Sequence, residues 1–135
     1  ILGACIASAG TIFVPRGKKA DRSTARRKIT SKLEGNSGAK ILSFPSGTTQ
    51  LSENIPWKKG IFEIAHATKV PIYAFKIEYR PLREIAYIDD DTFVSHIGKL
   101  DKVPKKSATL TWYGPFFPDD SPAIMAETLR RRIQE

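Results

Sequence analysis

The chain has 135 residues, 41% of them hydrophobic and 27% charged, which is the size and composition of one soluble folded domain. A single cysteine, Cys5, and two histidines thirty positions apart supply neither an internal disulfide nor the clustered ligands of a metal centre. The composition therefore excludes a disordered chain, a disulfide scaffold and a cysteine-rich zinc protein.

The first half of the chain alternates between strand and helix patterns. Thr11–Val14 is a short apolar run ended by Pro15, which predicts a strand. Ala20–Leu33 has a helical composition, and Ala39–Phe44 is apolar enough for a central strand. A glycine-containing turn, Pro45–Thr49, is expected at the carboxyl end of that strand.

The alternation continues through the second half. Gly60–Lys69 carries apolar residues at helical spacing, Val70–Tyr79 predicts a long strand, and Ile85–Ile88 predicts a short one. We expect a helix capped by Asp90 or Asp91, then a strand over Ser107–Tyr113. A last helix opens at Asp120, Ser121 and Pro122.

Burial of these last elements follows from their spacing. The first of these helices carries Phe93, Ile97 and Leu100 on one face. The residues expected to be buried are Ala108, Leu110 and Trp112 on the strand and Met125, Leu129 and Ile133 on the last helix. Those expected to face outward on the strand are Thr109, Thr111 and Tyr113. Strands alternating with helices predict an α/β fold.

The net charge of +8 is concentrated in one segment. Between Arg16 and Lys32 there are eight basic residues and one acidic residue, Asp21. This pattern indicates either a solvated basic helix or a surface for an anionic partner. A phosphate-bearing ligand, an acidic carrier, lipid headgroups and nucleic acid would each fit, and charge alone does not choose among them.

Three segments combine special backbone residues with basic or hydroxyl side chains. Gly10–Arg16 ends a strand with an arginine, whose planar donors suit phosphate. Phe44–Thr49 places a glycine turn where open α/β sheets bind ligands, and its successive amides from Gly47 onward predict an anion-binding nest. Pro56–Gly60 brings two lysines to a helix N-terminus, which itself attracts anions.

In this order the three segments resemble motifs of the glycerolipid acyltransferases, the 1-acylglycerol-3-phosphate acyltransferase family. That family shows a G-x-I-F-I-D-R-type block, an F-P-E-G-T-R block, a P-F-K-K-G block and a V-P-I strand. The last of these corresponds here to Val70–Ile72, and the ordered matches run from Gly10 to Phe75. Beyond Ile85 the likeness is looser and rests on Trp112–Phe116.

The resemblance implies an enzyme of phospholipid biosynthesis that moves a fatty acyl chain from acyl-CoA or acyl carrier protein to the hydroxyl of a lysophospholipid such as 1-acylglycerol-3-phosphate. It implies a central mixed, mostly parallel sheet flanked by helices, no cofactor besides the acyl donor, and no metal. It further implies association with the cytoplasmic face of a membrane and no nucleic-acid partner. The substrate-binding residues that it implies are Arg16, which would contact the acceptor phosphate, Pro45, Ser46, Gly47, Thr48, Lys58, Lys59 and Gly60.

The sequence departs from the family pattern at several positions. The family's glutamate and arginine in the F-P-E-G-T-R block are Ser46 and Thr49 here, and the aspartate before the motif arginine is Pro15. The family's upstream H-x4-D pair, which supplies the base, is also missing. His96 and Asp101 match its letters, but they follow every other motif on an amphipathic helix, where chance spacing explains them better.

We therefore expect residues 1–135 to form a single acyltransferase-like domain that is incomplete at its N-terminus. The first residue is Ile1 rather than Met, and the uncharged stretch Ile1–Pro15 is too short for a membrane helix and lacks the basic flank of a signal peptide. The catalytic histidine and aspartate would then precede Ile1, and the chain alone would be inactive. Two alternatives stay open, an inactive lipid-binding homologue and a basic module that binds nucleic acid or a membrane surface.

Overall fold

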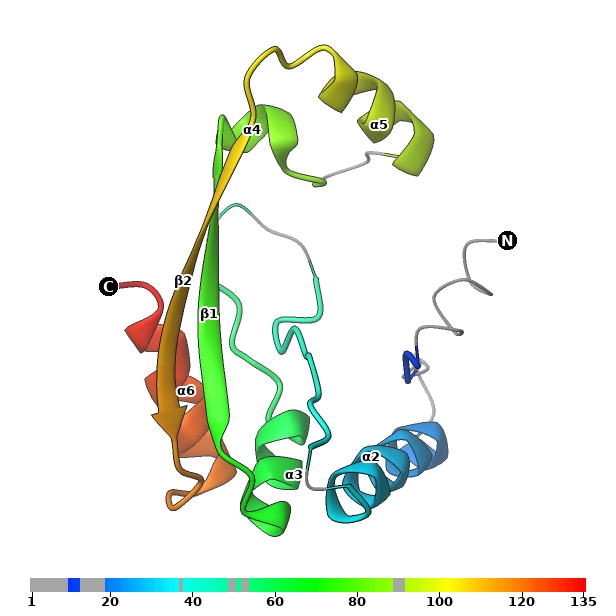
Figure 1. The fold of residues 1–135 in the computed structure, drawn as a ribbon, viewed down its shortest axis with the longest axis vertical. Coiled ribbons are helices and arrows are strands. Elements are labelled where there is room, and N and C mark those ends of the chain that lie inside the picture. The colour runs from blue at the N-terminus through cyan, green and yellow to red at the C-terminus, as the bar shows by residue number, and fades with distance from the viewer. Residues whose placement is uncertain (1–9, 13–18, 37, 49–50, 52–53, 89–91) are drawn as a thin grey trace.

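The computed structural model describes residues 10–12, 19–36, 38–48, 51, 54–88 and 92–135. Helices and strands follow one another in an order that fits the α/β class (Figure 1). The elements are α2 (Lys19–Glu34), α3 (Gly60–Thr68), β1 (Ile72–Arg80), α4 (Leu82–Ile85), α5 (Phe93–Asp101), β2 (Ser107–Phe116) and α6 (Pro122–Arg132). In the part of the chain described here, no helix combines the length and the apolar character needed to cross a membrane.

The sheet differs from the expected one. β1 and β2 form a two-stranded antiparallel ribbon in which Phe75 lies opposite Trp112 and Ile77 opposite Leu110. The expected mostly parallel central sheet is therefore wrong for the described residues. A parallel sheet needs further strands beside β1, and Ala39–Phe44 is not paired as a strand.

Of two shorter strand predictions, Ile85–Ile88 is wrong and Thr11–Val14 is not confirmed in its described half. Ile85 closes α4, and the residues from Ala86 to Ile88 are irregular although Ile88 is buried. Thr11 and Ile12 are not in a strand, and Phe13 and Val14 lie outside the described residues. A short apolar run is compatible with a strand, the end of a helix or a buried irregular segment. It is too short for its hydrophobic periodicity to tell these three structures apart.

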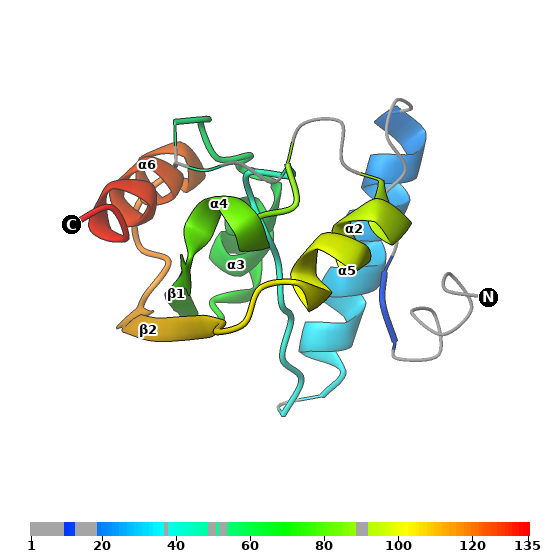
Figure 2. The same ribbon diagram turned by 90° about the horizontal axis from the view of Figure 1, so that it is seen from above.

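One face of the ribbon carries the core. Side chains of α3 and α6 pack there against residues of β1 and β2, and Figures 1 and 2 show where these elements lie. The buried cluster there consists of Phe62, Ala74, Met125, Ala126, Leu129 and Ile133. The stripe predicted for the last helix is confirmed, and Ser121 caps that helix by accepting the backbone N–H of Ile124.

The opposite face of the ribbon is apolar and exposed. Trp112 is 62% exposed and Leu110 is exposed beside it, whereas Tyr113 packs against the buried cluster. The predicted inward and outward sides of β2 are therefore reversed. Alternation shows that a strand has two different faces, but the position of α3 and α6 decides which face is covered.

The apolar side of α5 is exposed. Phe93 and Ile97 are exposed, and the buried residue of the helix is His96. The imidazole of His96 lies edge-on to Tyr87, with ring centroids 5.2 Å apart. α5 lies beside α4 at the far end of the ribbon from α3, which leaves its apolar side uncovered by the core (Figure 1).

Candidate functional site

The turn after Phe44 has a fixed backbone conformation. The N–H of Gly47 donates to the carbonyl of Phe44 at 3.1 Å, and Gly47 has a φ of +69°, which favours glycine. The Ser46 hydroxyl donates to the carbonyl of Thr48 at 3.1 Å. The predicted anion nest is wrong at Gly47, because its amide is used inside the turn, and Thr49 lies outside the described residues.

A second loop is joined to this turn by its backbone. The N–H of Lys58 donates to the carbonyl of Pro45 at 3.0 Å. This hydrogen bond brings the loop that carries the two lysines next to the turn that carries Gly47. The turn residues Pro45 and Gly47 are half-buried at this junction, whereas Lys58 is exposed. Pro45 and Lys58, thirteen residues apart in the sequence, are thus held together by this hydrogen bond.

The side chain of Lys58 lies over Gly47. A Cβ atom on Gly47 would stand 3.6 Å from Cδ and 3.3 Å from Cε of Lys58, and it would collide with the ammonium group. The glycine therefore makes room for this lysine as well as for the positive φ. Among the described residues, no carboxylate forms an ion pair with the Lys58 ammonium.

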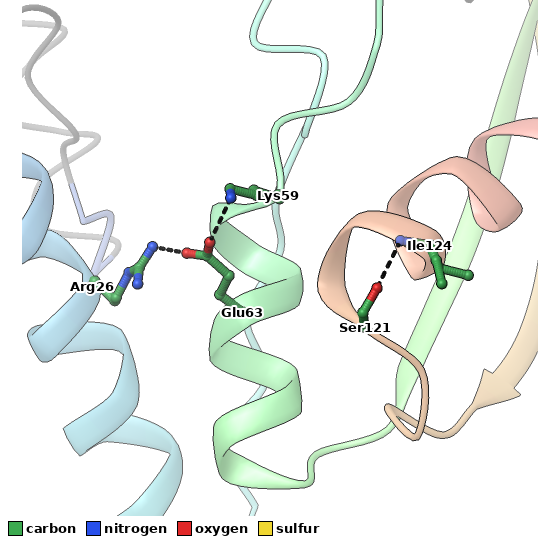
Figure 3. A network of polar contacts seen from close by, with 5 residues as sticks. All are labelled: Arg26, Lys59, Glu63, Ser121 and Ile124. Atoms are coloured by element: carbon green, nitrogen blue, oxygen red, sulfur yellow. Dashed lines mark hydrogen bonds and ion pairs between the residues drawn. The ribbon is translucent and has the colours of Figure 1, made fainter.

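The neighbouring Lys59 has a different environment. Its ammonium lies 3.6 Å from Oε1 of Glu63, one turn further along α3. The carboxylate of Glu63 also pairs with the guanidinium of Arg26 on α2 (Figure 3). The Lys59 side chain thus points along α3 toward Glu63, and the Glu63 carboxylate also joins α2 to α3.

The start of α3 adds to the positive potential of this site. Lys59 is the N-cap residue, and because its ammonium only donates hydrogen bonds, it does not cap the first amides of the helix. Gly60, the first helical residue, has open space where a side chain would stand. A helix N-terminus and a lysine ammonium are both groups that favour an anion.

Other predicted residues fall outside this arrangement. Arg16 lies outside the described residues, so the structure does not place it. Sequence reasoning missed Arg26 and Glu63, although Glu63 follows Lys59 by four residues, a spacing that indicates an ion pair on a helix. Lys32, another basic residue of the charged segment, points its ammonium toward Gly10, 3.5 Å from where a Cβ would be.

Neither histidine has the position of a base at this site. His66 is in the last turn of α3, about 9 Å along the axis from Gly60, which begins the helix. His96 is 7% exposed on α5, and Asp101 follows it by about 140° around the helix. The His96 and Asp101 match to the H-x4-D letters therefore describes no catalytic pair.

Comparison with known proteins gives one match. The family model described as Acyltransferase matches residues 1–78, which include the turn, both lysines and α3. No curated protein and no solved structure matches the chain. In the described part of the chain, no three potential ligands among His, Cys, Asp and Glu gather to hold a metal ion.

Proposed function

Because the chain belongs to the acyltransferase family, whose model covers more than half of it, we propose that it acylates a lysophospholipid. The acyl donor is acyl-CoA or acyl carrier protein, and the acceptor is a hydroxyl of a lipid such as 1-acylglycerol-3-phosphate. The family itself indicates acyl transfer in general. The acceptor and donor are proposed from the ordered motifs and from the site at Gly47 and Lys58.

The observation that supports this proposal most is the Lys58 ammonium held over Gly47 beside the start of α3. An ammonium group and a helix N-terminus form a small cationic site, and a phosphate monoester is the anion that a glycerolipid acceptor carries. The family pattern has an arginine at the position of Thr49. We propose that Lys58 replaces the guanidinium of that arginine as the phosphate contact. Arg16 is proposed as a second phosphate contact by resemblance to the motif arginine.

Acylation requires the acceptor hydroxyl to attack the thioester carbonyl. The new ester C–O bond forms as the C–S bond breaks, the hydroxyl proton goes to a base, and the thiol leaves. A phosphate fixed at Lys58 orients the acceptor and makes the attack effectively intramolecular. We assign the base role to no described histidine.

A membrane surface is the proposed setting of the reaction, at the cytoplasmic face. Lysophospholipids partition into membranes, and the net charge of +8 favours anionic headgroups. The exposed face of the ribbon also presents Trp112 and Leu110, and tryptophan is favoured at the membrane–water interface.

An acyl-transfer assay on the protein in its native form tests the proposal. The protein is incubated with acyl-CoA or acyl carrier protein and 1-acylglycerol-3-phosphate, and the diacyl product is quantified by mass spectrometry. We expect product from the native protein and a strongly reduced rate for Lys58→Gln. Acceptor binding without product from either donor would favour the inactive homologue, to which Ser46 and Thr49 point, and would contradict the proposed reaction.

A further inference from the structure

Two adjacent lysines at the start of α3 have different surroundings. The Lys58 ammonium lies over Gly47 and has no carboxylate partner among the described residues. The Lys59 ammonium instead lies 3.6 Å from Glu63. The two lysines are adjacent in the sequence, so a neighbouring group must produce this difference.

Glu63 is that cause. Its carboxylate is the common partner of Lys59 and of Arg26, which comes from α2 (Figure 3). Two cations therefore share one carboxylate within a turn of the anion site. With Glu63 in place, the charge of Lys59 and Arg26 is partly neutralised, whereas the Lys58 ammonium has no carboxylate partner within the described part of the chain.

We infer that Glu63 is a positioning and specificity residue. By pairing with Lys59 and Arg26, it leaves Lys58 as the lysine that binds the substrate, and it limits the site to a single phosphate group. The inference rests on the proposed function, because it concerns the anion bound at the same turn. One ammonium and a helix N-terminus suit a phosphate monoester. Release of Lys59 and Arg26 would add two cations and would favour a more highly charged anion such as pyrophosphate.

Calorimetric titrations with two probes, glycerol 3-phosphate and inorganic pyrophosphate, test this inference. For Lys58→Gln we expect at least a tenfold weaker affinity for glycerol 3-phosphate, and for Lys59→Gln a change of less than twofold. Glu63→Gln should raise the affinity for pyrophosphate at least five times more than the affinity for glycerol 3-phosphate. A purely structural role of Glu63 would not change this ratio.

A measurement without substitutions complements the titrations. Lysine side chains are reductively methylated with and without glycerol 3-phosphate, and the modified peptides are quantified by mass spectrometry. We expect the ligand to protect Lys58 at least five times more than Lys59. Equal protection, or equal losses for Lys58→Gln and Lys59→Gln, would overturn the inference while leaving phosphate recognition intact. If the wild-type protein binds neither probe, the proposed phosphate site and this inference both fail.

Discussion

Replacing Gly47 with alanine separates the two reasons for a glycine in the turn. The first is the backbone, because a φ of +69° costs an L-residue about 1–2 kcal/mol. The second is space, because the new Cβ would meet the Lys58 side chain. Since the far end of a lysine is flexible, Lys58 moves aside at little cost in stability but leaves the anion site.

We therefore expect two separate effects of Gly47→Ala. The free energy of unfolding should fall by roughly 1–2 kcal/mol, which lowers the melting temperature by about 4–8 °C for a domain of this size. The affinity for glycerol 3-phosphate should fall about tenfold, equivalent to about 1.4 kcal/mol. Urea unfolding and calorimetric titration measure the two effects independently.

Two further variants make the test selective. Gly47→Asn should lose less stability, because asparagine tolerates the left-handed conformation, but its Cβ still displaces Lys58 and should weaken binding as much as alanine does. Gly98→Ala is the control on α5, where nothing lies within 4 Å of the added Cβ, and it should leave binding unchanged. Unchanged glycerol 3-phosphate affinity in a destabilised Gly47→Ala protein would refute the account of Lys58.

Three predictions concern stability. Leu129→Ala removes a side chain that is 1% exposed and should cost about 2–5 kcal/mol in chemical unfolding, whereas Val94→Ala, at an 81% exposed position, should change stability by less than about 0.5 kcal/mol. Ser121→Ala removes the cap of α6 and should cost about 1 kcal/mol in urea unfolding, most of which Ser121→Asp should restore. The hydrogen bond from Arg130 lowers the pKa of Glu127 below its ordinary value of 4.5. The ionised Glu127 carboxylate therefore stabilises the fold above pH 4.5, and this stability is lost as the pH falls through the lowered pKa. Glu127→Gln should make the free energy of unfolding less dependent on pH in this acid range. An unchanged pH dependence would contradict the role of Arg130.

The sequence predicted the helices better than the sheet, for a physical reason. The spacing of Met125, Leu129 and Ile133 defines one buried side of a helix whatever it packs against, and the start of that helix is set locally by Ser121. A strand has two faces, and which of them is buried depends on elements elsewhere in the chain. For that reason the alternation around Trp112 predicts the strand correctly but assigns the wrong side of it to the core.

The candidate site was predicted in part. The family resemblance drawn from the ordered motifs is confirmed by the match over residues 1–78. The contact between Lys58 and Gly47 was not predictable, because it depends on one backbone hydrogen bond between the two loops, from Lys58 to Pro45. The different state of Lys59 could have been inferred from its four-residue separation from Glu63.

Binding of a phosphate-bearing acceptor is the direct test of the role of Lys58. A short-chain 1-acylglycerol-3-phosphate and the matching monoacylglycerol, which lacks the phosphate, are titrated below their micelle concentrations into residues 1–135 and into the Lys58→Gln variant. We predict that the wild-type chain binds the phosphate-bearing lipid at least tenfold more tightly and that Lys58→Gln abolishes this preference. Equal affinity of the wild-type chain for both lipids, or a preference that survives in Lys58→Gln, would contradict the role of Lys58 in acceptor recognition.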